Sequence, residues 1–142
     1  MADLPTSLTL EVATPLGMPL SVQTDNVQVP SVAGEFGVLP GHLPLLAALK
    51  PGILSWKEGA QTLRAAVGGG FAEATASRVR IITEFFVKQG EVDLEAAQRD
   101  LATAQQRLKD TKATVADVEY REAQRDVDWA QARITLAGAS TN

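Results

Sequence analysis

Residues 30–46 read PSVAGEFGVLPGHLPLL, and this stretch decides how the rest of the chain is interpreted. Its three glycines permit positive-φ turns, whereas Pro40 and Pro44 fix φ and remove backbone donors. The segment is therefore predicted to be a rigid, bent loop and not a helix. We expect the apolar side chains between these breakers to pin the loop to a core: Phe36, Leu39, Leu43, Leu45 and Leu46. Rigid loops on β scaffolds commonly carry recognition, so the stretch is a candidate binding edge.

Alternating apolar residues on both sides of this stretch predict short β-strands. In Ser7–Ala13, Leu8, Leu10 and Val12 share one face. Further strands are expected around Leu20 and Val22, around Val27 and Val29, and over Ile53–Trp56, Thr62–Val67, Phe71–Thr75 and Val79–Val87. The intervals hold turn formers and leave no room for crossover helices, so the strands are predicted to form an antiparallel sandwich or barrel.

Beyond Gly90 the apolar period becomes helical, and the remaining chain holds one glycine and no proline. The first stripe is Leu94, Ala97, Leu101, Ala104 and Leu108, and the second is Ala116, Tyr120, Ala123, Val127, Ala130, Ile134 and Ala137. Asp93 is a predicted N-cap, Thr114–Asp117 resembles a capping box, and Gly138 ends the second helix. With Lys109–Ala113 as the connection, the two helices are predicted to form a close antiparallel hairpin.

Two regions are therefore expected, a β-rich region over residues 1–90 and a helical hairpin over residues 91–142. The hairpin has few large apolar side chains for its length. Helices of this kind draw most of their stability from tertiary packing, so the hairpin is predicted to need a surface to lie on. An arm that is only marginally stable by itself is also one that moves readily.

Composition excludes several classes of site. The chain has no cysteine and one histidine, His42, which excludes disulfides, thiolate metal sites and histidine clusters. A formal net charge of −4 disfavours nucleic-acid binding. Gly68–Gly70 lacks the Lys-Ser/Thr of a phosphate loop, so we interpret it as a tight turn or a close approach between strands. No signal segment and no apolar run of about 18 residues is found, so the chain is expected to be soluble without inserting into a membrane.

The stretch from Gly34 to Gly52 resembles the signature of epsilon subunits of F-type ATP synthases, and Gly68–Glu73 resembles a second recurring patch of that family. The resemblance covers essentially the whole chain. It implies a ten-stranded antiparallel β-sandwich followed by a C-terminal antiparallel two-helix hairpin. It also implies a non-catalytic rotor subunit of the central stalk, bound peripherally at the cytoplasmic face of the bacterial inner membrane.

The resemblance further implies partners and contact residues. The loop expected to face the membrane rotor ring contains Ser31, Glu35, Phe36 and Gly37, and the contact with the gamma subunit is expected at Gly41, His42 and Leu43. The helical arm is expected to restrain ATP hydrolysis through transient contact with the catalytic head, with Arg99, Arg107, Arg121 and Arg125 as candidate cations. A simple solvated face is the alternative interpretation of these charges.

Some members of the family bind ATP on the hairpin through a motif of the form Ile/Leu-Asp-x-x-Arg-Ala. Here Asp93 matches the aspartate, but Ala96 stands where the motif has arginine. Since the cation that would meet a phosphate is missing and Asp93 is explained as a helix cap, we predict no ATP binding and no cofactor.

Two other functions are weighed against the rotor subunit. The first is a free-standing β-sandwich adapter with a coiled arm. The second is a small hydrolase, for which His42 would have to act as the base near neutral pH. Its sequence neighbours Gly41, Leu43 and Pro44 offer no nucleophile, which argues against catalysis.

Overall fold

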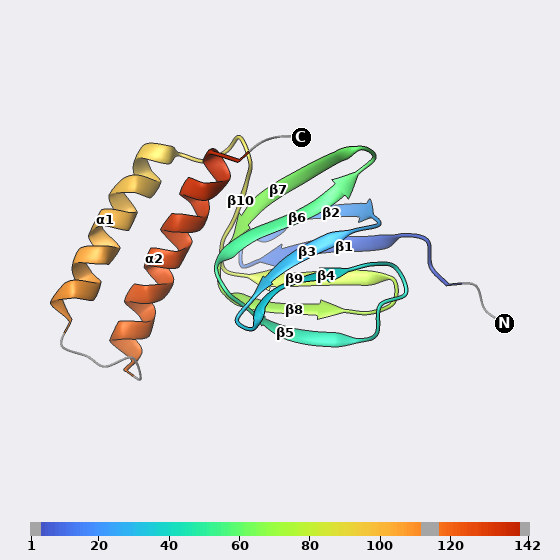
Figure 1. Cartoon of the computed structure of the whole chain (residues 1–142), viewed down its shortest axis with the longest axis horizontal. Helices are drawn as coiled ribbons and strands as arrows, with labels where there is room; N and C mark the ends of the chain where they lie inside the picture. The colour runs from blue at the N-terminus through green and yellow to red at the C-terminus, as the bar shows by residue number, and fades with distance from the viewer. Residues whose placement is uncertain (1–3, 112–116, 140–142) are drawn as a thin grey trace.

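The computed structural model describes residues 4–111 and 117–139, and these contain ten strands and two helices (Figure 1). The strands are β1 (Leu8–Thr14), β2 (Gly17–Thr24), β3 (Val27–Ser31), β4 (Gly34–Val38), β5 (Leu45–Leu49), β6 (Gly52–Glu58), β7 (Gln61–Val67), β8 (Gly70–Ala74), β9 (Arg78–Thr83) and β10 (Phe86–Lys88). The helices are α1 (Leu94–Asp110) and α2 (Val118–Ala137). The predicted ten-stranded sandwich with a C-terminal helical hairpin is confirmed.

The strands form one continuous hydrogen-bonded path in the order β10-β7-β6-β3-β5-β8-β9-β1-β2, with β4 paired to β3 outside this path. The path folds over on itself, so that the β6–β7 strands lie across from the β5–β8–β9 strands in Figure 1. Every pair is antiparallel except one: β1 runs parallel to β9, in a register that joins Leu10 to Val79 and Val12 to Ile81. The sequence did not predict this pairing, because strand alternation carries no information on which distant strands meet.

The core lies between the two layers and consists of the inward positions of nearly every strand. Its largest fully buried side chains include Leu8, Leu10, Val12, Val27, Val29, Val38, Leu54, Val67, Val79 and Ile81. These positions alternate along β1, β3 and β9, as the predicted period of two requires.

The prediction of a single loop over residues 30–46 is wrong, because this stretch contains β4 and the start of β5. The expected pinning residues Leu39, Leu43 and Leu46 are instead 57%, 79% and 69% exposed. Strand alternation explains the difference. Val38 faces inward opposite Val27, and Leu45 and Leu49 face inward on β5, which turns Leu46 to the other side.

One predicted strand is split. The run expected over Val79–Val87 ends at Thr83 and resumes at Phe86, because the backbone leaves one strand layer for the other at Glu84 and Phe85. At this break the Phe85 carbonyl accepts from the Gly68 amide at 2.9 Å and the Thr83 hydroxyl at 3.3 Å. Phe85 itself remains half exposed.

The close approach predicted at Gly68–Gly70 is confirmed. Gly70 has φ of +148°, and a Cβ at this position would lie 1.9 Å from the Ile82 carbonyl oxygen. A Cβ at Gly68 would lie 3.0 Å from the Phe85 ring. The glycines therefore allow β8 and the β9–β10 connection to meet at backbone distance.

The two helices lie antiparallel beside the strands, with α2 between α1 and the sandwich (Figure 1). Asp93 caps α1 as predicted, since its carboxylate accepts from the Ala96 amide at 3.0 Å. The described part of α2 begins at Val118 with Asp117 at the N-cap position. Thr114–Ala116 and the end of the predicted connection lie outside the described residues, and α1 itself extends through Lys109 to Asp110.

Alanines form the contact between the helices. Ala97 and Ala104 on α1 and Ala123 and Ala130 on α2 are buried, as the predicted stripes require, whereas Leu94 is exposed. A second buried face on α2 was not predicted: Ala132 and Leu136 pack with Ala66 of β7, and Ile53, Val92 and Trp129 lie partly buried around them. This face provides the supporting surface that the hairpin was expected to need.

Candidate functional site

The predicted ring-facing residues lie on the β3–β4 hairpin. The Ser31 hydroxyl donates to the Gly34 carbonyl at 2.5 Å and accepts from the Ala33 amide at 3.2 Å, which closes the turn. Gly34 has φ of +116°, a conformation that suits glycine. The turn is tied to β5, because the Val32 amide donates to the Ala48 carbonyl at 3.0 Å. It is therefore a fixed projection of the sandwich.

The four residues named for this projection do not share one environment. Glu35 and Gly37 are exposed, whereas Ser31 is buried and Phe36 packs partly against the core. Sequence reasoning missed Val32, an exposed apolar residue at the tip of the turn. Glu35 and Val32 are therefore the side chains that this hairpin offers to a partner.

The predicted gamma-contact residues lie in the connection from β4 to β5. Gly41, with φ of +85°, donates its amide to the Ala76 carbonyl at 2.7 Å, which holds the connection against the β8–β9 turn. His42 Nδ1 donates to the Leu43 carbonyl at 2.5 Å, while the Leu43 side chain is exposed. This contact engages Nδ1, one of the two ring nitrogens, within the connection itself.

Exposed apolar side chains continue from this connection onto the neighbouring strands. Phe71 of β8 pairs directly with Ile82 of β9, and Leu46 of β5 lies diagonally beside Phe71. All three are about half exposed or more. Directly paired residues of an antiparallel sheet point to the same face, so these side chains form one apolar strip, which we call the outer strand face.

Sequence reasoning did not identify this face. Leu46 was assigned to the core, and Phe71 and Ile82 were counted only as strand residues. The alternation of Phe71, Ala72, Glu73 and Ala74 shows that β8 has two different faces, but it does not determine which of the two faces the core. Alanine is buried here and phenylalanine exposed, the reverse of the usual preference.

A charged row borders the outer strand face. Glu73, Arg80 and Glu11 are successive register partners on β8, β9 and β1. Glu11 is only 8% exposed and accepts from Arg78 Nε at 2.9 Å, with Arg80 Nη2 at 3.7 Å. The positive charges of the two arginines thereby compensate the charge of the buried Glu11 carboxylate.

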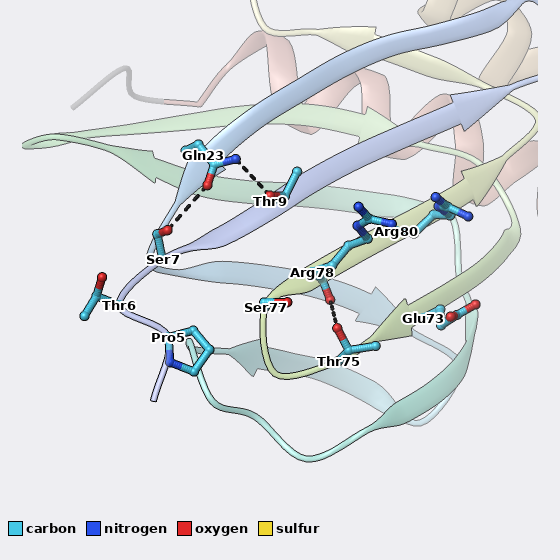
Figure 2. Close-up of a pocket in the computed structure, with 10 residues that line it drawn as sticks. All are labelled: Pro5, Thr6, Ser7, Thr9, Gln23, Glu73, Thr75, Ser77, Arg78 and Arg80. Carbon is cyan, nitrogen blue, oxygen red and sulfur yellow. Dashed lines mark hydrogen bonds between the residues drawn. The ribbon is translucent and has the colours of Figure 1, made fainter. Parts of the chain in front are cut away.

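The charged row opens into a shallow polar cleft of about 480 Å³ (Figure 2). Arg78 and Arg80 stand along β9, and Glu73 stands on the neighbouring strand. On the far side Gln23 Nε2 donates to the Thr9 hydroxyl at 2.8 Å. The lining is polar, although the buried Arg80 Nε has no hydrogen-bond partner among the described residues, so the cleft forms a hydrophilic border to the apolar strip.

The predicted regulatory arginines fall into two groups. Arg107 bridges the helices, with Nη1 3.1 Å from Asp126 and Nη2 3.3 Å from Glu122. Arg99, Arg121 and Arg125 are exposed and have no ion-pair partner among residues 4–111 and 117–139. Arg121 and Arg125 border a groove between α2 and the strands, opposite Leu49 and Pro51.

The described residues hold no group of three or more His, Cys, Asp or Glu side chains arranged to bind a metal ion. Asp93, named for nucleotide binding, is engaged as the N-cap of α1. Neither helix of the described chain is long and apolar enough to cross a membrane.

Comparison with known proteins gives consistent matches. The sequence model of the ATP synthase delta/epsilon chain β-sandwich domain matches residues 7–89. The ATP synthase epsilon chain 2 of Syntrophotalea carbinolica is 38% identical over 131 residues, covering 92% of this chain and 94% of that protein. The ATP synthase epsilon chain of an Anaeromyxobacter species (strain K) is 39% identical over 132 residues, covering 93% and 98%.

The fold also matches a solved structure. A chain in the cryo-EM structure of the Euglena gracilis mitochondrial ATP synthase, which contains OSCP, F1 and the c-ring, superposes with a TM-score of 0.77. Its sequence identity is 22%, and the match covers 92% of this chain and 81% of that one. This likeness supports the fold.

Proposed function

The chain belongs to the family of ATP synthase epsilon subunits, and on that premise we propose that it is a non-catalytic rotor subunit linking the gamma subunit to the membrane rotor ring. The observation that carries the proposal is the outer strand face. Leu46, Phe71 and Ile82 leave an apolar strip uncovered on a rigid sheet. Apolar surface of this kind with a polar rim is typical of protein–protein contact.

We assign the gamma contact to this face together with the β4–β5 connection. Gly41, His42 and Leu43 lie at its edge, held by the hydrogen bond from Gly41 to Ala76. Leu43 offers a further exposed apolar side chain three residues before Leu46, and the His42 ring is hydrogen-bonded to the Leu43 carbonyl. The charged row of Glu73, Arg80 and Glu11 would form the polar rim.

The β3–β4 projection is the proposed contact with the rotor ring. Its turn is fixed by Ser31 and presents Val32 and Glu35 to solvent. A rigid projection with one apolar and one acidic side chain suits the exposed polar loops of a ring. Phe36 packs partly against the core behind the projection, whereas Gly37 is exposed.

The helical arm, residues 91–142, is proposed to restrain ATP hydrolysis by transient contact with the catalytic head, while residues 1–90 provide the docking body. The cluster that joins α2 to the strands contains only two large α2 side chains, Trp129 and Leu136, whose full burial would contribute about 3–6 kcal/mol, so the docking contact is of limited strength. Arg121 and Arg125 face the groove beside the strands in the docked arm. Once the arm has left the sandwich, they would be free to meet an acidic surface of the head.

We further propose that the protein works without a cofactor, peripherally at the cytoplasmic face of the bacterial inner membrane. Two features of the hairpin argue against ATP binding. Ala96 supplies no cation, and Arg107 is already paired with Glu122 and Asp126.

The test is carried out on the whole synthase in its membrane. Removing residues 91–142 should leave an assembled complex that synthesises ATP and hydrolyses it faster than the complex with the full chain. Loss of gamma binding on this truncation would contradict the assignment of docking to residues 1–90. A full chain that does not co-purify with gamma and the ring would instead favour the free-standing adapter.

The hydrolase alternative is tested separately through His42. Replacing His42 by Ala should leave the catalytic activity of the complex intact, because His42 contacts a backbone carbonyl and lies beside no nucleophile in the sequence. A loss of hydrolysis in a complex that still contains this subunit would reopen that alternative.

A further inference from the structure

We propose that Arg133 couples the closing of the helical hairpin to its docking on the strands, so that the two contacts weaken together. The proposal rests on the proposed function for its biological meaning, since it concerns the arm that must move. It is argued from three successive side-chain contacts: Phe85 of the sandwich with Trp129 of α2, Trp129 with Arg133 of α2, and Arg133 with Asp100 of α1.

The first contact joins the sandwich to α2. The rings of Phe85 and Trp129 stack with centroids 5.3 Å apart and an interplanar angle of 20°. Phe85 is held in place by its backbone, whose carbonyl accepts from Gly68 and Thr83. Trp129 therefore meets a fixed aromatic surface at the break between β9 and β10.

The second contact is that of Arg133 with Trp129 on α2 itself. The Arg133 guanidinium carbon is 5.1 Å from the centroid of the Trp129 ring, within range of a cation–π interaction. Arg133 Nε also donates to the Trp129 carbonyl at 3.4 Å. The side chain of Arg133 is only 14% exposed, so its position is set by these neighbours.

The third contact joins α2 to α1. Arg133 Nη2 lies 3.0 Å from Asp100 Oδ2, an ion pair between the two helices. One guanidinium thus touches the partner helix and the residue that docks on the strands. When α1 separates from α2, Arg133 loses the Asp100 carboxylate that orients it over Trp129. When α2 separates from the strands, Trp129 loses its stacking on Phe85, and Arg133 loses the ordered ring that it contacts.

The other end of the hairpin supplies a natural comparison. Arg107 bridges α1 to Asp126 and Glu122 with similar distances, but no cation–π contact to Trp129 is found for it in the part of the chain that the structure describes. Both ion pairs close the hairpin. Arg107 and Asp126 line a cavity together with Phe85 and Trp129, but of the two arginines only Arg133 has a cation–π contact with the Trp129 ring. Stronger coupling is therefore expected at the Arg133 end than at the Arg107 end.

Docking is measured by thiol labelling of the isolated full chain. Because the chain has no cysteine, Ala132→Cys introduces a single thiol in the docking contact, where Ala132 is buried against the strands. When redocking is faster than labelling, the labelling rate reports the fraction of time that the arm is undocked. Ala74→Cys, buried in the sandwich core, reports global unfolding in a parallel sample.

A double-mutant cycle then tests the coupling. Phe85→Ala should speed labelling of Cys at position 132 by about 2- to 13-fold, the range for an aromatic pair. Asp100→Asn should speed it by at most about 5-fold, the upper range for a partly exposed ion pair. In the Phe85→Ala background, Asp100→Asn should leave the labelling rate nearly unchanged, because the Phe85–Trp129 stack through which it acts has already been removed.

Asp126→Asn serves as the matched control, since it weakens the ion pair at the other end. Its effect on labelling should change less between the backgrounds with and without Phe85 than the effect of Asp100→Asn does. Equal effects of Asp100→Asn in both backgrounds would overturn the proposal, as would a loss of effect for both aspartates, which would indicate general loosening of the hairpin. The cycle needs no synthase, so its outcome is distinct from the hydrolysis measured in the complex.

Discussion

The replacement of Phe71 by alanine is the most direct test of the outer strand face. A buried aromatic side chain covers roughly 150–250 Å². Phe71 is 55% exposed, so about 100 Å² of its surface is available to a partner. At about 25 cal/mol per Å², burial of this area contributes ~2.5 kcal/mol, or about 70-fold in affinity.

The assay is binding of the full chain to a synthase depleted of this subunit, measured by titration of a labelled chain. Phe71→Ala should weaken binding by about 10- to 70-fold, since alanine retains part of the contact. The variant should remain folded, because the lost side chain lies outside the core. Leu94→Ala is the control: Leu94 is 41% exposed on α1, the helix that α2 separates from the strands (Figure 1).

The reasoning would be refuted if Phe71→Ala weakened binding by less than about 3-fold, or no more than Leu94→Ala. In that case the apolar strip would not be the surface that gamma covers. Ile82→Ala, the register partner on β9, should show a smaller loss in the same direction, because it removes less apolar area.

Three further predictions concern the body and the arm. Gly70→Ala should lower the midpoint of thermal unfolding far more than Gly59→Ala, because a Cβ at 70 meets a backbone carbonyl at 1.9 Å whereas nothing lies within 4 Å at 59; equal shifts would contradict the close approach. Titration calorimetry with millimolar ATP should give no saturable heat, and clear saturation would show that the hairpin binds nucleotide despite Ala96. Asp93→Ala should destabilise α1 by about 1 kcal/mol through loss of its cap, seen as faster hydrogen exchange in the first turn; unchanged exchange would argue against the cap.

The sequence predicted the elements well where periodicity decides them. The period of two located most strands, since Leu8, Leu10 and Val12 form an inward face that any sheet must bury. The helical period located both helices, and Asp93 fixed where α1 begins because its carboxylate has a free amide to accept from. These features depend on neighbours within a few residues.

What the sequence could not predict depends on distant partners. Leu46 and Leu49 look alike in sequence, yet only the pairing of β5 with β8 determines that Leu49 is buried and Leu46 exposed. Trp129 belongs to neither predicted stripe, and its role follows from meeting Phe85 across the docking contact. A helix such as α2, which contacts both another helix and a sheet, buries a broader surface than one stripe. An analysis that looks for a single narrow stripe therefore finds only one of its two contact surfaces.

The parallel pairing of β1 with β9 has a consequence for how the chain is made. Thr9 and Arg78 are register partners, so the first strand finds one of its neighbours only after about seventy further residues have been synthesised. Such distant pairing raises the contact order and slows folding, because the loop must close before the contact stabilises it. The β1–β2 hairpin therefore keeps one edge unpaired until β9 has been synthesised. Both helices lie beyond β10 in the chain, so every strand of the sandwich is made before the arm that packs on it.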